Sequence, residues 1–210
     1  MPIIFPCPNP TCESHVQRKK LTAKDELAGR TLLCPACKTQ VTVPTALEQA
    51  EIDRFCAEEG YGSETTQNQK NWLLYKAIRD NRDFAVIHFL VSQDADVDAK
   101  CTNDMTPLHC AIAQRNVKVV KYLIPKVNDV IGKHANELTL LHLAACLGDE
   151  EVIKALVEGS KENHKELNIN AKDNDGLTPL DYAKEIGKND KVVDYLSKKG
   201  AWYSGLIQHD

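Results

Sequence analysis

Two pairs of cysteines near the N-terminus are the residues whose types and spacing best suit chemistry. Cys7 and Cys12 are separated by four residues, Cys34 and Cys37 by two, and 21 residues lie between the pairs. A tight turn presents two thiolates to one ion, so two turns supply the four ligands of a tetrahedral Zn²⁺ site, with Zn–S distances of about 2.3 Å. The spacing therefore predicts a closed structural zinc site with no open position for catalysis.

Other uses of these residues remain open. His15 lies three residues after Cys12 and offers an imidazole in place of one thiolate. The motif Cys34-Pro-Ala-Cys37 alone has the form of a redox pair, but that chemistry requires a strand-to-helix context. Here the alternating segment 39–43 predicts a strand after the motif instead.

Residues 25–44 read Asp-Glu-Leu-Ala-Gly-Arg-Thr-Leu-Leu-Cys-Pro-Ala-Cys-Lys-Thr-Gln-Val-Thr-Val-Pro, which closely resembles a bacterial zinc-ribbon module. The resemblance covers residues 3–44 and implies a small β fold whose Zn²⁺ is held by Cys7, Cys12, Cys34 and Cys37. The first pair departs from the commoner spacing of two residues. A module of this size buries too little apolar surface to fold alone, whereas structural zinc contributes on the order of 10–16 kcal/mol of apparent binding free energy.

Some zinc ribbons bind nucleic acid, and Arg18, Lys19 and Lys20 form a basic cluster in this segment. No aromatic residues are interleaved with the cluster, so stacking support for bases is missing. The formal charge of the whole chain is −4, which argues against a general affinity for nucleic acid or anionic membranes. Nucleic-acid binding therefore stays an alternative to a purely structural role.

Farther along the chain, four segments repeat a Thr-Pro-Leu-His-x-Ala pattern. The copies lie at 106–111, 139–144 and 178–183, with a weaker copy at 72–77, and their leucines are 34, 33 and 39 residues apart. This pattern and period resemble the ankyrin repeat. The resemblance implies a β-turn and two antiparallel helices per repeat, and a stacked surface that holds partners.

The predicted fold class is mainly α: an ankyrin-repeat solenoid of about four helix-turn-helix repeats, preceded by a small β zinc ribbon. We expect the zinc ribbon at 1–44, an acidic helical linker at 45–67, ankyrin repeats at 68–203 and a C-terminal tail at 204–210. The atypical first and last repeats are predicted to cap the array, because its outer faces meet water.

The linker is predicted to form a helix. Thr45 and Glu48 have the spacing of a capping box, and Gly60 marks the end of the helix. Leu47, Ile52 and Phe55 form an apolar stripe. The helix is either solvated or docked on the first repeat, and the sequence does not decide between these interpretations.

Two departures from the repeat pattern have structural consequences. Asp104 and Glu137 replace the hairpin glycine, whose φ is often positive. Glu tolerates that conformation poorly, so we expect a distorted turn in the third repeat. The third repeat also carries a six-residue excess within 158–167, which is expected to form a polar loop available to partners.

The resemblance places the partner-binding groove on the hairpin tips and on the inner faces of the first helices. The positions carried over contain amides, carboxylates and aliphatic side chains, but no Lys or Arg. Such a mixture suits a protein segment better than a phosphate backbone. The predicted groove residues are Thr102, Asn103, Met105, Ala113, Gln114, Ala135, Asn136, Leu138, Cys146, Leu147, Asn174, Asp175 and Leu177, with Glu185 and Ile186 in the last repeat.

His109 and His142 lie inside the repeated pattern, and the resemblance implies that each imidazole binds backbone near the start of a helix. His142 and Cys146 share a helix face at a spacing of four residues. A Cys–His nucleophile pair also needs an oxyanion hole and an orienting third group, and the sequence offers neither. No catalytic residue is predicted.

These observations predict a non-enzymatic adaptor that binds a protein partner and holds Zn²⁺. The sequence contains no run of about 18 apolar residues, so no membrane span is predicted. The N-terminus lacks the pattern of a secretory signal peptide. The remaining cysteines are scattered singly, as in a reducing compartment. We expect a cytoplasmic protein, in the bacterial cytosol or, by analogy with effectors of intracellular bacteria, in the host cytosol. The alternative is a zinc-ribbon nucleic-acid-binding protein with ankyrin repeats as a regulatory arm.

Overall fold

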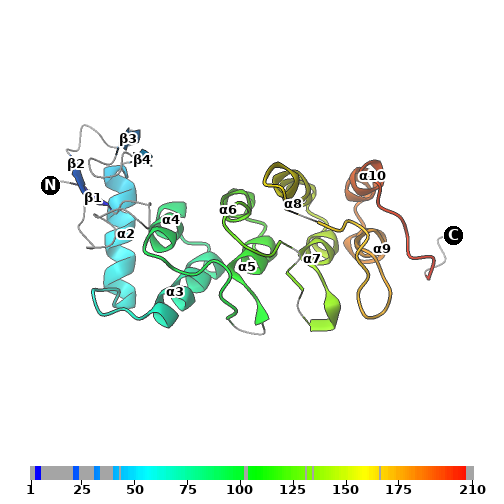
Figure 1. Ribbon diagram of the computed structural model, residues 1–210, viewed down its shortest axis with the longest axis horizontal. Coiled ribbons are helices and arrows are strands. Elements are labelled where there is room, and N and C mark those ends of the chain that lie inside the picture. Colours follow the sequence, from blue (N-terminus) through cyan, green and yellow to red (C-terminus); the bar gives the residue numbers. More distant parts are fainter. Residues whose placement is uncertain are drawn as a thin grey trace. The chain divides into compact units, whose positions relative to one another are not determined.

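The fold is described from a computed structural model and is mainly helical over the residues that it describes (Figure 1). Those residues are 3–5, 21–23, 31–33, 40–42, 44–101, 104–130, 132–133, 135–165 and 167–206. The chain divides into two compact units, Met1–Asp96 and Val97–Asp210. Each unit is described on its own.

Four short strands lie at the start of unit 1. β1 (Ile3–Phe5) pairs antiparallel with β2 (Leu21–Ala23), and β3 (Thr31–Leu33) pairs antiparallel with β4 (Gln40–Thr42). β4 falls within the strand expected at 39–43. The predicted zinc ligands Cys7, Cys12, Cys34 and Cys37, together with His15, lie outside the described residues.

Helix α2 (Ala46–Glu59) begins and ends where the sequence predicts. Thr45 and Glu48 form the capping box, and Gly60 closes the helix with φ 64°. The apolar stripe is only partly correct: Ile52 and Phe55 are buried, but Leu47 is 82% exposed. Leu47 belongs to the first turn of α2, and the helix buries side chains only farther along, where α2 packs against α4.

The first repeat consists of α3 (Gln67–Arg79) and α4 (Phe84–Ser92). α2 packs against α4, so the docked interpretation of the linker helix is the one that the structure shows. Two ion pairs also join α2 to the first repeat. Nζ of Lys76 on α3 lies 2.6 Å from Glu59, and Nη2 of Arg82, between α3 and α4, lies 2.8 Å from Glu58. The acidic side of α2 therefore neutralises cations of the first repeat.

Unit 2 contains three further helix pairs in two layers. The inner layer is α5 (Pro107–Ala113), α7 (Leu140–Leu147) and α9 (Pro179–Tyr182), which continues as the π-helical turn η4 (Ala183–Gly187). The outer layer is α6 (Val117–Leu123), α8 (Glu150–Glu162) and α10 (Asp190–Lys198). Neighbouring helices pack within each layer, α5 on α7, α7 on α9, α6 on α8 and α8 on α10 (Figure 1).

The repeated pattern explains the inner layer. A threonine caps each of α5, α7 and α9, and a proline begins α5 and α9, where its missing N–H leaves no hydrogen bond unmade. Each pattern leucine and alanine is at most 1% exposed, so both form the core between neighbouring repeats. These residues are Leu108, Ala111, Leu141, Ala144, Leu180 and Ala183.

The insertion in the third repeat is not the predicted loop. α8 has 13 residues whereas α6 has seven, so the extra residues lengthen the outer helix as far as Glu162. Ser160 is fully buried there, and a Cβ on Gly159 would lie 3.0 Å from the Ile124 side chain. The prediction was wrong because this polar segment extends the helix and packs against the preceding repeat.

The chain after α10 covers the end of the last repeat. Trp202 donates its backbone N–H to Asn170 Oδ1 at 2.9 Å, and its carbonyl accepts from Thr178 Oγ1 at 3.0 Å. The backbone N–H of Ser204 donates to Asp181 Oδ2 at 3.1 Å. The described part of the tail therefore adds hydrogen bonds to the polar groups at the open end of the array.

A close approach between the third and fourth repeats yields the first prediction. A Cβ built on Gly187 would lie 2.3 Å from the carbonyl oxygen of Ala145. Gly187→Ala should therefore lower the free energy of unfolding by about 1–3 kcal/mol, because the backbone must shift to admit a methyl group. The measurement is urea unfolding followed by circular dichroism.

Gly62→Ala is the matched control, since nothing lies within 4 Å of a Cβ at that position. It should change stability by less than about 0.5 kcal/mol. Equal stability of the Gly187→Ala protein and the unaltered protein would contradict the close packing of these two repeats.

Candidate interaction groove

The described parts of three hairpin segments extend to one side of unit 2, each preceding an inner helix (Figure 1). In the second repeat the N–H of Cys101 donates to the carbonyl of Met105 at 2.9 Å. In the fourth repeat the N–H of Asp173 donates to the carbonyl of Leu177 at 3.0 Å. These bonds close the loops, and their tips together with the ends of the inner helices form the surface that we call the groove.

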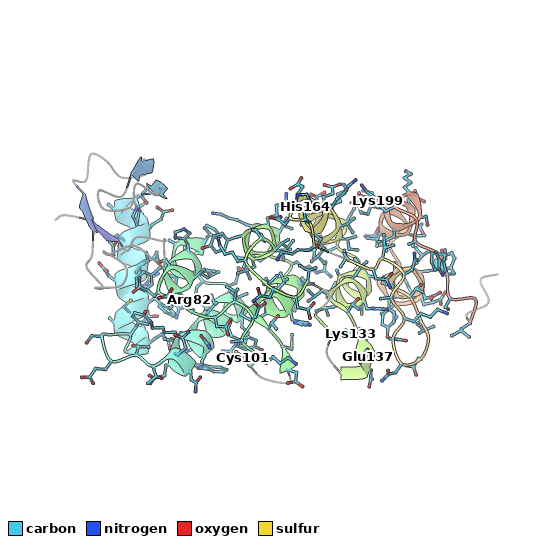
Figure 2. The ribbon with its side chains drawn as sticks, in the orientation of Figure 1. Arg82, Cys101, Lys133, Glu137, His164 and Lys199 are labelled. Atoms are coloured by element: carbon cyan, nitrogen blue, oxygen red, sulfur yellow. The ribbon has the colours of Figure 1, made fainter. Side chains whose placement is uncertain are left out.

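The hairpin tips use the left-handed conformation at one repeated position. Asp104 and Glu137 both have φ 59°, and Gly176 has φ 79°. The third hairpin is distorted as predicted, because Asn136 (φ 64°) is left-handed as well and the segment forms a short 3-10 turn, η3 (Ala135–Glu137). Figure 2 shows Lys133 and Glu137 together at this tip, and their charged groups are 2.5 Å apart.

The inner helices α5 and α7 are each joined to the next hairpin through the histidine of their pattern. In the third repeat the backbone N–H of Thr139 donates to Nδ1 of His142 at 3.1 Å, and the Thr139 hydroxyl lies 2.8 Å from the same nitrogen. Nδ1 is therefore the acceptor, and Nε2–H donates to the carbonyl of Leu177 in the next repeat at 3.1 Å. The expectation that this imidazole binds backbone near a helix start is confirmed.

His109 makes the same connection from the second repeat. Thr106 donates its N–H to Nδ1 at 3.2 Å, and Nε2 lies 2.8 Å from the carbonyl oxygen of Gly132 in the third hairpin. Both ring nitrogens of both histidines are thus committed to positioning the next hairpin. Neither ring is available as a general base or as a metal ligand without breaking the array.

The last repeat places Asp181 where the second and third repeats have histidine. Oδ2 accepts from the N–H of Thr178 at 2.8 Å, and the carboxylate also accepts from the N–H of Ser204. Burial raises the pKa of Asp181, but the hydrogen bonds from Thr178 and Ser204 outweigh burial and hold this pKa below its usual range. An acceptor replaces a donor here because the tail presents an N–H, whereas the internal hairpins present a carbonyl.

A second buried carboxylate shapes the fourth hairpin. Asp173 accepts the N–H groups of Asp175 and Leu177, each at 2.9 Å, and the hydroxyl of Tyr182 at 2.8 Å. Burial and the hydrogen bond to Asp173 raise the pKa of Tyr182 to about 12. The ring of Tyr182 meets the ring of His142 edge to face, with centroids 5.3 Å apart. The floor of this part of the groove is therefore fixed.

Most of the groove residues that the sequence predicts lie on accessible parts of these loops and helix ends. Thr102 and Asn103 lie outside the described residues, and so does the side chain of Ala135. The remaining predicted positions are half-buried or exposed, so each presents some surface to a partner. The half-buried ones are Met105, Leu138, Cys146, Leu147 and Leu177, and the exposed ones are Ala113, Gln114, Asn136, Asn174, Asp175, Glu185 and Ile186.

The prediction that the groove lacks Lys and Arg was wrong. Arg115 donates from Nη2 to the carbonyl of Leu147 at 2.9 Å, and Lys133 pairs with Glu137. Aligning the repeats would have identified Arg115, because it occupies the inter-helix position that Gly148 holds in the next repeat, with φ 54° and 65° respectively. Lys133 precedes the repeated pattern, and no regularity of the sequence indicates it.

A hollow of about 220 Å³ lies between the hairpins of the second and third repeats. Carboxylates of Asp98, Asp104 and Asp129 line it, along with the amines of Lys100 and Lys133. Asp98 also accepts two hydrogen bonds from Asn128, one from its backbone N–H at 2.9 Å and one from Nδ2 at 2.7 Å. This volume is below the usual range of small-molecule pockets and suits a single side chain.

Among the described residues, no group of three or more His, Cys, Asp or Glu side chains is arranged to hold a metal ion. Cys146 is half-buried at the end of α7, and the nitrogens of nearby His142 are already bonded to Thr139 and Leu177. Cys146 and His142 therefore do not form a nucleophilic Cys–His pair, although they lie four residues apart on one helix.

Comparison with protein families agrees with this architecture. Models of ankyrin repeats match residues 73–124 and 126–204. The chain therefore belongs to the ankyrin-repeat family across residues 73–204. No curated protein matches the sequence.

No helix within the described ranges is both long enough and apolar enough to cross a membrane.

The bonding of His142 yields a pH-dependence prediction. Burial lowers the pKa of His142 from its ordinary 6.5, although the Leu177 carbonyl and the carboxylates of Asp173 and Asp181 oppose this shift. The folded state then binds fewer protons than the unfolded state, so stability falls as the pH decreases from about 6.5 to the folded pKa. Urea unfolding at a series of pH values between about 7.5 and 5 measures this loss.

His142→Gln removes the titrating group, so its stability should fall less steeply with pH over this range. His164→Gln is the control, because it makes the same exchange at an exposed residue outside the inner helices. Identical slopes for the His142→Gln protein and the unaltered protein would show that neutral His142 does not connect the two repeats.

Proposed function

We propose that the protein is a non-enzymatic adaptor whose groove in unit 2 binds a segment of a partner protein. The observation that carries this proposal is that buried and exposed polar side chains of the repeats have different roles. Buried polar groups such as His142, Asp173 and Asp181 are used within the fold. The hairpin tips, in contrast, present side chains that the fold does not need for burial.

The chemistry of that surface favours a polypeptide ligand. Met105, Leu138 and Leu177 hold the same position in successive hairpins and are all half-buried, so each leaves apolar surface for a partner. Amides and carboxylates at Asn136, Asn174 and Asp175 lie beside this series. Such a mixture resembles the composition of protein interfaces, in which an apolar centre is surrounded by polar groups.

For the N-terminal segment we propose a structural zinc ribbon. Its support is the donor set, since four thiols in two short pairs are the ligands that a closed zinc site requires. Cys7, Cys12, Cys34 and Cys37 would hold the ion, which would supply folding free energy rather than reactivity. The module would act as a second contact surface of the adaptor.

We also propose a cytosolic location, either in a bacterium or, after delivery, in a host cell, because the remaining cysteines are scattered singly as in a reducing compartment. The pairing of a bacterial-type ribbon with a repeat common in eukaryotic proteins supports a role as an effector, by analogy between modules. The competing proposal is a nucleic-acid-binding ribbon regulated by the repeats, for which the cluster Arg18–Lys20 is the supporting feature. Salt-dependent binding of DNA or RNA by the full chain would favour it.

Groove binding is tested by affinity capture with the full chain, followed by mass spectrometry. Leu138→Arg combined with Leu147→Arg should reduce recovery of the captured protein at least tenfold, because both substitutions place charge on the apolar part of the groove. Both side chains are only half-buried, so the variant should keep the helical circular dichroism of the parent.

The matched control is Lys118→Glu combined with Lys121→Glu on α6, which alters two exposed residues of the outer layer. This control should capture the same protein as the parent. If the groove variant and the parent recover equal amounts, the groove is not the binding surface.

The zinc proposal is tested by elemental analysis of protein purified without added metal. We expect one zinc per chain, and we expect Cys34→Ala combined with Cys37→Ala to abolish tight binding, because two of four ligands are removed. Cys101→Ala combined with Cys146→Ala is the control and should retain the metal. A parent protein free of zinc would remove the ribbon from the account.

A further inference from the structure

The partner of the groove is defined further by charge. The three hairpin segments 98–105, 128–138 and 171–177 contain six carboxylates and only three lysines. Lys133 and Glu137 neutralise each other as an ion pair, which leaves five carboxylates and two lysines in these segments. The hairpin side of unit 2 is therefore acidic, although the repeats as a whole are nearly neutral.

The outer layer, in contrast, carries a cluster of positive charge on and after α6. The segment 117–127, which contains α6, carries Lys118, Lys121 and Lys126 and no carboxylate. An acidic partner, including a nucleic acid, would be attracted to that layer and not to the hairpins. Charge complementarity thus selects a basic partner for the groove.

The hollow between the hairpins of the second and third repeats is the position where a cation of a basic partner would bind. Three aspartates and two lysines line it, so carboxylates outnumber amines, and Asp104 and Asp129 are exposed. Its volume of about 220 Å³ suits one side chain. The fourth hairpin has a different arrangement, since the N–H of Asn174 donates to the carbonyl of Asn136 at 3.0 Å and joins the two tips. A cationic side chain of a partner is therefore best received between repeats two and three.

The spacing of the repeats determines the conformation of such a segment. Packed helices lie about 8–10 Å apart, and an extended or polyproline-like chain rises about 3.1–3.3 Å per residue. One repeat therefore corresponds to about three residues of an extended ligand. Met105, Leu138 and Leu177 would meet aliphatic side chains at this interval, with cations beside the carboxylates.

We infer that the groove recognises an extended basic segment in which aliphatic and cationic residues recur about every three residues, with one Arg or Lys entering the hollow between the hairpins of repeats two and three. This inference rests on the proposed groove function and names the partner class for it. Recognition depends on the groove carboxylates, so it weakens as salt concentration rises.

The test uses fluorescence anisotropy of the full chain with a labelled peptide of repeated Leu-Ser-Arg triplets. Asp104→Asn combined with Asp129→Asn should weaken its affinity about tenfold, as expected for the loss of two partly solvated charge pairs. Asn tolerates the left-handed conformation at position 104, and Asn at 129 still accepts the N–H of Gly132, so this variant keeps the loop geometry.

Glu151→Gln combined with Glu162→Gln on α8 changes the net charge by the same amount outside the groove and should alter affinity less than twofold. Comparison peptides are a scrambled sequence of the same composition and a Leu-Ser-Glu series, and both should bind at least fivefold more weakly. Equal weakening by the two double variants, or equal affinity for the three peptides, overturns the inference.

The two proposals fail in distinguishable ways. If the triplet peptide shows no preference but Leu138→Arg with Leu147→Arg still abolishes capture of a protein partner, only the basic-segment inference is wrong. If capture survives that groove variant, the groove function itself is wrong.

Discussion

The arrangement of unit 2 depends on how each repeat satisfies the first turn of its inner helix. A threonine accepts the N–H at the third position of the helix, and the side chain at that position accepts the N–H of the threonine in return. When that side chain is histidine, its second nitrogen binds the carbonyl of the next hairpin. One local motif therefore both starts a helix and positions the neighbouring loop.

This constraint connects the core to the interaction surface. Because His109 and His142 hold Gly132 and Leu177, the hairpins follow the inner helices at a regular interval. The last repeat keeps the motif but reverses the hydrogen bond, since Asp181 accepts from Ser204 in the tail. The same chemistry that joins repeats thus also ends the array, and the fixed hairpins are free to present varied side chains at their tips.

The sequence predicts these local features well, because their partners lie three or four residues apart. The capping box of α2 and the positive φ at Asp104 and Glu137 follow from such short-range rules, whereas the backbone bonding of the histidines was expected from the resemblance of the repeated pattern. Predictions that depended on tertiary contacts were less successful. The exposure of Leu47, the helical insertion before Glu162 and the place of Arg115 in the groove are decided by packing against other elements.

Neutral histidines, protonated on Nε2, connect successive repeats of unit 2. Long-range ¹H–¹⁵N correlation spectra report the tautomer of each imidazole directly. For His109 and His142 we expect a protonated Nε2 and an unprotonated Nδ1 at about pH 7.5, with no averaging between tautomers. Protonation on Nδ1, or a mixture of the two tautomers in the folded protein, would contradict it.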